Sequence, residues 1–291
     1  MGHLELLERH AVSIREDIIT MLEEAGSGHS AGPLGMADIY AALYFSVLRH
    51  DPKKPEWAER DRLILSCGHT CPVRYAAMAE AGYFPRKELL TLRKFGTRLH
   101  GHPHNLALPG LETSSGPLGQ GLSQAAGMAL AAKMDGKKWR TYCVVSDGEH
   151  QEGQIWEAVM FAGNRKLNNL TAILDRNYIQ IDGPTESIMP LEPFADKYRA
   201  FNWHVIEIDG HNMQEILDAC KEAEAVADRP TLILAHTIPG KGVDFMEGDY
   251  RWHGVPPDLS DISGAPAKGS QAKEALGQLR TLKGQITSEH E

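Results

Sequence analysis

Two polar residues that follow short apolar runs could together bind a metal ion. Asp147 comes just after the run at 142–145, and Asn177 comes shortly after the run at 170–174. The carboxyl ends of parallel strands meet at one edge of a sheet, so these residues are expected to lie close together. A carboxylate, an amide oxygen and a free backbone carbonyl suit magnesium when phosphate oxygens complete its coordination. Taken alone, however, Asp-Gly and Arg-Asn-Tyr more often form a turn and a loop.

Several histidines follow helices or strands and could meet a ligand or a metal. His29 lies among small residues in the segment 26–35, which is expected to be a loop, and His69 lies between Cys67 and Cys71. A zinc site at these cysteines is a weak alternative, because no second Cys or His pair has zinc spacing. His100, His102 and His104 alternate, which allows a metal clip, a solvated loop or a substrate-facing His102. Gly101 and Pro103 favour a loop there.

The segment 113–127 is rich in glycine and precedes a helix of small residues expected at 120–134. Glycine allows a ring or a phosphate to approach the main chain, and a helix N-terminus favours anions. Close helix packing explains the alanines of this segment equally well.

Alternating strands and helices must position these residues. Strands are expected at 62–66, 142–145, 170–174, 203–208 and 231–235, and helices at 4–24, 36–48, 120–134 and 213–227. This alternation predicts an α/β fold with an open, mainly parallel sheet. Residues 264–291 are polar and are expected to form a surface helix and a frayed tail.

Composition excludes several classes of protein. The 291 residues are 42% hydrophobic and 24% charged, which is typical of a globular protein with a large core. A formal net charge of −9 gives no support for a nucleic-acid or anionic-membrane partner. No apolar run reaches the roughly 18 residues of a membrane span, and no signal peptide is recognised. The four scattered cysteines are those expected of a cytoplasmic protein with reduced thiols.

Nine motifs in a fixed order resemble the diphosphate-binding half of transketolases. They are GH-x3-PLGMA (28–37), LS-x-GH (65–69), GHP (101–103), GPLGQG (116–121), DG-x3-EG (147–153), N-x-I-x-IDG (177–183), DGH (209–211), GKG (240–242) and HG-x-P (253–256). The resemblance covers about residues 10–260, so residues 1–260 are expected to form the thiamine diphosphate-binding domain and 261–291 a helix and tail. It implies a three-layer α/β fold with helices on both faces of the sheet.

The resemblance also assigns roles at a thiamine diphosphate site. Asp147, Asn177 and the carbonyl of Ile179 would hold Mg²⁺, with Ca²⁺ or Mn²⁺ as substitutes, while Gly148 would donate its backbone N–H to the diphosphate. His69 and His253 match diphosphate contacts, and Gly116 and Leu118 match residues of the ring pocket. His29, His102 and His253 match the substrate-facing, catalytic histidines. Glu152 and Glu157 match a carboxylate network at the subunit interface. Arg176 departs from the usual second Asn before Asn177, at a variable position that is not a ligand.

Length is the largest departure, because the pyrimidine-binding domain and the third domain of transketolases do not fit into the residues after 260. The chain is therefore expected to be the N-terminal subunit of a split enzyme. A separate C-terminal subunit would carry the pyrimidine-binding domain, in an α2β2 heterotetramer.

The expected reaction is transfer of a two-carbon ketol unit from a ketose phosphate to an aldose phosphate. Pentose phosphates are the default substrates, with branched or sulfonated sugars left open. One alternative is a subunit similar to deoxyxylulose-phosphate synthase, against which the PLGMA, GPLGQG and WHG patterns argue. A non-catalytic scaffold or regulatory paralogue is the other.

Overall fold

A five-stranded parallel sheet forms the centre of the molecule. The computed structural model describes residues 2–281. The strands are β1 (Arg62–Leu65), β2 (Thr141–Ser146), β3 (Leu170–Arg176), β6 (His204–Asp209) and β7 (Thr231–His236), in the spatial order β1-β2-β3-β7-β6. Every neighbouring pair is parallel. All five strands were expected from the sequence, with bounds that differ by no more than two residues, and the predicted fold class is confirmed.

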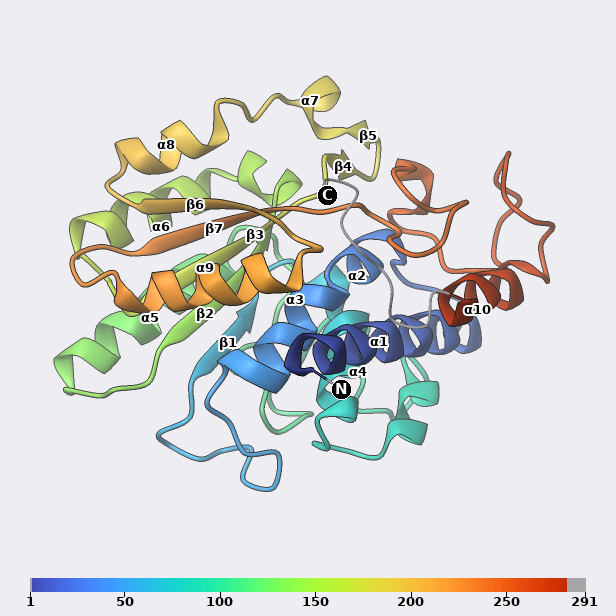
Figure 1. The fold of residues 1–291 in the computed structure, drawn as a ribbon, viewed down its shortest axis with the longest axis horizontal. Coiled ribbons are helices and arrows are strands. Elements are labelled where there is room, and N and C mark those ends of the chain that lie inside the picture. Colours follow the sequence, from blue (N-terminus) through green and yellow to red (C-terminus); the bar gives the residue numbers. More distant parts are fainter. Residues whose placement is uncertain (1, 282–291) are drawn as a thin grey trace.

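Helices cover both faces of this sheet, as Figure 1 shows. One hydrophobic core joins alternate strand residues such as Leu65, Val144 and Ile173 to helices on one face. These helices are α1 (His3–Ala25), α3 (Ala37–Ala42), α4 (Cys71–Glu80) and α9 (Met213–Ala225). The intervening strand residues, such as Cys143 and Ala172, belong to a second core on the other face. That face is covered by α5 (Gly121–Met134), α6 (Gly153–Asn164) and α8 (Phe194–Ala200).

Burial on both faces explains why the central strands are apolar without alternation. Every residue of β2 and β3 is buried, whereas most residues of the edge strand β6 are partly exposed. The last described helix, α10 (Gln271–Thr281), packs against α1. The tail expected beyond it lies outside the described residues.

Two segments differ from the sequence expectation. The segment 26–35 was expected to be a loop, but its second half forms helix α2 (Ala31–Gly35). Only glycine fits at position 35 without a shift of the backbone, because a Cβ there would lie just 2.9 Å from the carbonyl oxygen of Ile238. The helix expected at 36–48 begins at Ala37 and ends in a π-helical turn, η1 (Leu43–Val47).

Short elements complete the path of the chain. A small antiparallel hairpin, β4 (Ile179–Gln180) and β5 (Gly183–Pro184), follows β3 and leads into α7 (Thr185–Ile188). The 3-10 turns are η2 (Gly68–Thr70), η3 (Arg86–Thr91), η4 (Gly148–Gln151) and η5 (Tyr250–Trp252). Two of these turns, η2 and η4, closely follow strands β1 and β2 at the carboxyl edge of the sheet.

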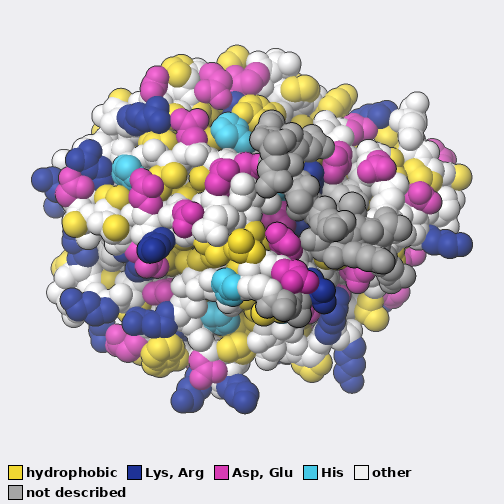
Figure 2. Space-filling model, viewed as in Figure 1, with side chains coloured by type: hydrophobic (Ala, Val, Ile, Leu, Met, Phe, Trp, Pro, Cys, Tyr) yellow, Lys and Arg dark blue, Asp and Glu magenta, His cyan; other side chains and the backbone are white. Residues whose placement is uncertain are grey.

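The surface mixes charges of both signs. On the face in Figure 2, basic and acidic side chains are interspersed. Among the residues that the structure describes, no helix has both the length and the apolar character that crossing a bilayer requires.

Candidate active site

The carboxyl ends of β1, β2 and β3 open into a cavity of about 350 Å³. This volume lies in the range of small-molecule sites. Most of the residues predicted from the sequence line it, although they come from loops far apart in the chain. They are His29, His69, His102, Gly116, Leu118, Gly148, Glu152, Asn177, Ile179 and His253. Asp147 is buried just behind this lining, and Glu157 is an exposed residue of α6 outside it.

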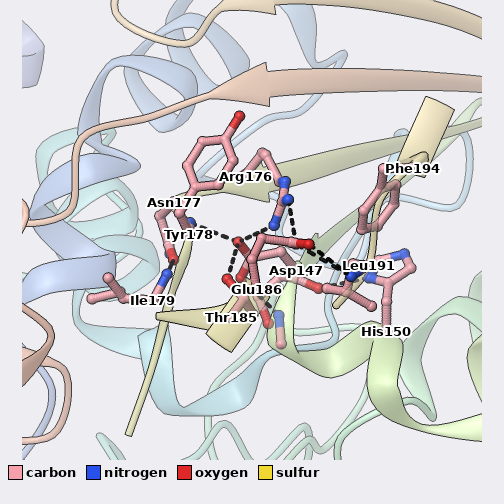
Figure 3. A network of polar contacts seen from close by, with 12 residues as sticks. Asp147, His150, Arg176, Asn177, Tyr178, Ile179, Thr185, Glu186, Leu191 and Phe194 are labelled. Carbon is pink, nitrogen blue, oxygen red and sulfur yellow. Dashed lines mark hydrogen bonds and ion pairs between the residues drawn. The ribbon is translucent and has the colours of Figure 1, made fainter. Parts of the chain in front are cut away.

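Asp147 lies directly after β2, and both its carboxylate oxygens face polar groups (Figure 3). Its Oδ1 accepts the backbone N–H of Gly148 at 2.7 Å, and its Oδ2 accepts the N–H of Tyr178 at 2.7 Å. The Arg176 guanidinium donates to Oδ2 at 3.1 Å. Burial raises the pKa of Asp147, and the Arg176 charge and the two backbone N–H groups oppose this rise.

Asn177 is oriented by the residues around it. Its Nδ2 donates to Oδ2 of Asp175 at 2.8 Å, and its Oδ1 accepts the N–H of Ile179 at 3.1 Å. Tyr178 has a left-handed backbone with φ of 63°, which is uncommon for a bulky residue and turns the chain sharply. This turn brings the N–H of Tyr178 to Asp147 and places Asn177 and Ile179 in the cavity wall.

Arg176 is fully buried and connects the end of β3 to the segment after α7. Besides Asp147, its guanidinium contacts Glu186 at 2.7 Å (Figure 3). It also contacts Glu192 at 2.8 Å. The ring of Tyr178 stacks over it, with a distance of 4.1 Å from Cζ to the ring centroid. The sequence resemblance indicates only a variable position that is not a ligand, whereas the structure makes Arg176 the central cation of the network.

Three histidines from distant loops form a cluster in the cavity. The ring centroids of His29 lie 4.8 Å from His69 and 5.5 Å from His253, and those of His69 and His253 lie 5.3 Å apart. Burial lowers the pKa of His29 to about 3 and that of His253 to about 4. Burial also lowers the pKa of His69 and of His102. The imidazoles are therefore neutral at pH 7 and can each accept and donate a hydrogen bond.

The polar atoms of this cavity fit a phosphorylated ligand. Nδ1 of His29 and Nδ1 of His253 are buried without a hydrogen-bond partner among the described residues. Such atoms are costly unless a ligand or water pairs them. The glycine-rich segment 113–127 packs closely on the residues that follow β1. A Cβ on Gly68 would lie only 3.0 Å from the backbone nitrogen of Gly116. The oxygens of Asp147 and Asn177 are hard donors of the type that Mg²⁺ prefers.

Two buried carboxylates of the cavity wall were missed at the sequence level. Burial raises the pKa of Asp175 to about 7, and its carboxylate accepts from Thr237 and Asn177. Glu149 accepts the N–H of Gly119 at 2.7 Å and a hydrogen bond from Ser66, which fastens the glycine-rich loop to the strand ends. Asp175 directly follows the apolar run at 170–174, and this position at a strand end is the sequence signal that could have indicated it. Glu149 lies inside the motif at 147–153, at a position that the motif leaves unspecified.

The alternative metal sites are not formed. Across residues 2–281, no group of three or more His, Cys, Asp or Glu side chains is arranged to hold a metal ion. The zinc alternative at Cys67, His69 and Cys71 needs such a group, as does the clip of alternate histidines. The Sγ of Cys71 instead lies 3.2 Å from the carbonyl oxygen of Gly101.

Known proteins resemble this chain in both sequence and fold. A profile described as "Transketolase, thiamine diphosphate binding domain" matches residues 7–276. The 6-deoxy-6-sulfo-D-fructose transketolase subunit of Clostridium sp. (strain MSTE9) is 47% identical over 249 residues, which are 86% of this chain and 90% of that protein. One subunit of the apulose-4-phosphate transketolase of Phocaeicola vulgatus is 41% identical over 254 residues, 87% of this chain and 90% of that protein.

Solved structures agree with these relatives. Transketolase from Campylobacter jejuni superposes with a TM-score of 0.83 at 31% identity, over 98% of this chain and 48% of that chain. The chain thus spans about half the length of such transketolases. Fold, cavity, family profile and relatives all agree, and the predicted resemblance is confirmed: the chain belongs to the transketolase family and corresponds to its thiamine diphosphate-binding domain.

Proposed function

We propose that this chain is the thiamine diphosphate-binding component of a split transketolase and acts with a separate subunit that carries the pyrimidine-binding domain. The complex transfers a two-carbon ketol unit from a ketose phosphate, or a similar anionic ketose, to an aldose phosphate. The observation that carries the proposal is the cavity. Three clustered, neutral histidines line it together with Asn177 and Gly148.

The metal end of the site uses Asp147, Asn177 and the carbonyl of Ile179. These residues would hold Mg²⁺ through oxygen ligands, and the ion would supply positive charge that neutralises the diphosphate. Asp147 is presented with one carboxylate oxygen held by Arg176 and Tyr178, so its orientation is fixed before any ion arrives. Asp175 holds the amide of Asn177 through Nδ2, while the amide oxygen accepts one hydrogen bond from the Ile179 N–H and keeps a second lone pair for a metal.

The histidines supply the diphosphate and substrate contacts. His69 and His253 would donate to phosphate oxygens, and Gly116 and Leu118 would pack against the cofactor ring. When bound, thiamine diphosphate supplies the nucleophilic carbon for cleavage of the ketose C–C bond. His29, His102 and His253 would hydrogen-bond the sugar hydroxyls and move a proton from the hydroxyl that becomes a carbonyl. Their lowered pKa values keep these imidazoles unprotonated at neutral pH, so each has a free ring nitrogen.

A partner chain is supported by the relatives. The two split relatives are named as subunits, and each aligns with this chain over 90% of its own length. Glu152 lies in the cavity wall, and Glu157 lies on the exposed side of α6. Both side chains are exposed, so a second chain can reach them. An α2β2 heterotetramer is the symmetric assembly that this arrangement favours.

The test is a calorimetric titration of thiamine diphosphate with Mg²⁺ into this chain, alone and mixed with the candidate pyrimidine-domain subunit. The mixture is then assayed for ketol transfer. Tight binding and transfer that appear in the mixture support the split enzyme. An absence of cofactor binding in both states would reject the proposal and leave a scaffold as the better explanation.

A further inference from the structure

A second, smaller cavity lies at the amino end of β1, away from the candidate active site at the carboxyl ends of the strands. Its volume is about 20 Å³, which is room for one water molecule or one single-atom ion. Its wall includes Asp61 and Leu63 at β1, Arg74 of α4, and Gly110 and Glu112 of the following loop. None of these residues belongs to the nine family motifs.

Arg74 is the residue of this wall whose hydrogen bonds are incomplete. Its side chain is buried, with only 1% of the residue exposed. Nη2 donates to the carbonyl oxygen of Gly110 at 3.3 Å, whereas Nε and Nη1 have no hydrogen-bond partner among the described residues. The phenol of Tyr44 is close enough to interact with the guanidinium but is neutral, because burial raises its pKa. Since arginine keeps its proton in proteins, Arg74 brings a positive charge into the interior.

The carboxylates of the wall already have partners. Both oxygens of Asp61 accept backbone N–H groups, each at 2.8 Å. Glu112 pairs with Arg60 at 2.8 Å, and its other oxygen lies 3.9 Å from Nε of Arg62. In the part of the chain that the structure describes, Arg74 has no carboxylate at ion-pair distance. Three guanidinium groups at or beside the cavity thus face two carboxylates.

We propose that this cavity binds a single-atom monovalent anion, chloride in ordinary solutions, against the guanidinium of Arg74. A buried charge without a counter-charge is strongly unfavourable, and a water molecule that accepts its hydrogen bonds adds no negative charge. A halide accepts hydrogen bonds from Nε and Nη1 and also balances the charge. The site goes beyond the proposed transketolase function, because neither the cofactor nor the sugar takes part in it. The bound anion would connect α4 to the loop at 110–112 and stabilise the fold.

The first test measures thermal unfolding of the full chain in sodium chloride and in sodium gluconate at equal concentration. Gluconate provides the same ionic strength but is too large for this cavity. The measured quantity is the Tm in chloride minus the Tm in gluconate. We expect this difference to rise with salt concentration to a plateau at least about 2 °C higher in wild type than in Arg74→Met, because a ligand that binds the folded chain stabilises it. The matched control Arg229→Met removes an arginine whose side chain is 40% exposed, and it should behave like wild type.

The second test uses crystals of the full chain grown with sodium bromide, because bromide resembles chloride and is located by its anomalous scattering. An anomalous peak in contact with Nε and Nη1 of Arg74 is expected. This readout needs no variant, so it decides the question even if Arg74→Met does not fold.

Two results would overturn the proposal. One is an equal difference between the two salts in wild type and in folded Arg74→Met. The other is a water molecule at this position without any bromide signal. Both tests use the chain without thiamine diphosphate or a partner subunit, so their outcome is separate from that of the proposed function.

Discussion

Asp147 has two roles. It forms a buried ion pair with Arg176, and it provides a carboxylate for the proposed metal. We predict that Asp147→Ala removes Mg²⁺-dependent binding of thiamine diphosphate.

His102→Ala should retain cofactor binding and slow ketol transfer about a hundredfold, the typical loss for an acid–base group. His102 is exposed at the cavity, and its removal leaves no buried group unpaired. Calorimetry and a transfer assay measure the two effects. Loss of cofactor binding without loss of rate in His102→Ala would contradict the substrate-facing role of His102, and circular dichroism must show that both variants fold.

Arg176 balances the buried charge of Asp147. We predict that Arg176→Leu lowers the free energy of unfolding by about 3–5 kcal/mol, since it leaves a buried carboxylate without its partner. Glu192→Gln is the matched control. The side chain of Glu192 is 54% exposed, so the loss of its ion pair with Arg176 should cost less than about 1 kcal/mol. Urea denaturation followed by circular dichroism compares the variants, and equal losses would show that the buried pair with Asp147 is not the dominant contact.

His29 links the site to the pH dependence of folding. Burial lowers its pKa to about 3 in the folded chain, below the ordinary value of 6.5. Between these values the unfolded chain binds a proton that the folded chain does not, so stability falls as the pH drops from about 6.5 toward 3. We predict that His29→Asn reduces the slope of unfolding free energy against pH by about 1.4 kcal/mol per unit in this interval. Urea unfolding at about pH 6 and about pH 5, both inside this interval, measures the slope, and an unchanged slope would contradict the prediction.

Two helical glycines differ in how much space surrounds their Cβ positions. Gly163 lies in α6, where a Cβ would come within 1.9 Å of the carbonyl oxygen of Phe201. Gly127 lies in α5 with open space around its Cβ position. We therefore predict that Gly163→Ala destabilises the fold by more than about 2 kcal/mol through this clash. Gly127→Ala should stabilise it by about 0.5–1 kcal/mol through helix propensity. Thermal unfolding of the two variants tests the pair, and a destabilising effect of Gly127→Ala would mean that α5 is covered in solution.

The elements differ in how far the sequence could predict them. Strands β2 and β3 are short apolar runs bounded by polar residues, a pattern that determines both their type and their position. The helix α2 was missed because its glycines and proline favour a loop, whereas the close approach of Gly35 to the carbonyl of Ile238 joins residues far apart in the sequence. Family motifs placed Asp147 and Asn177. Arg176 could not be placed in the same way, because its partners Glu186 and Glu192 come from a segment without a periodic pattern.

At the scale of the whole molecule, the last described helix lies against the first. Helix α10 packs on α1, and Ala272, Ala275 and Leu279 are fully or almost fully buried in the same core as the face of the sheet that α1 covers. This core also contains residues of α3 and α4, which follow the loops of the candidate site. The C-terminal helix is therefore part of the folding unit and joins regions that are far apart in the sequence.

We predict that Leu279→Ala lowers the free energy of unfolding by about 2–5 kcal/mol, because the side chain is fully buried and its removal leaves a cavity. Lys273→Ala, on the exposed face of the same helix, should stay within about 0.5 kcal/mol of wild type. Urea denaturation of both variants separates packing from helix propensity, since alanine favours the helix in each. If Leu279→Ala were also neutral, α10 would be detached from α1 in solution. A single cooperative transition at lower urea would instead show that the sheet, its helices and α10 unfold as one unit.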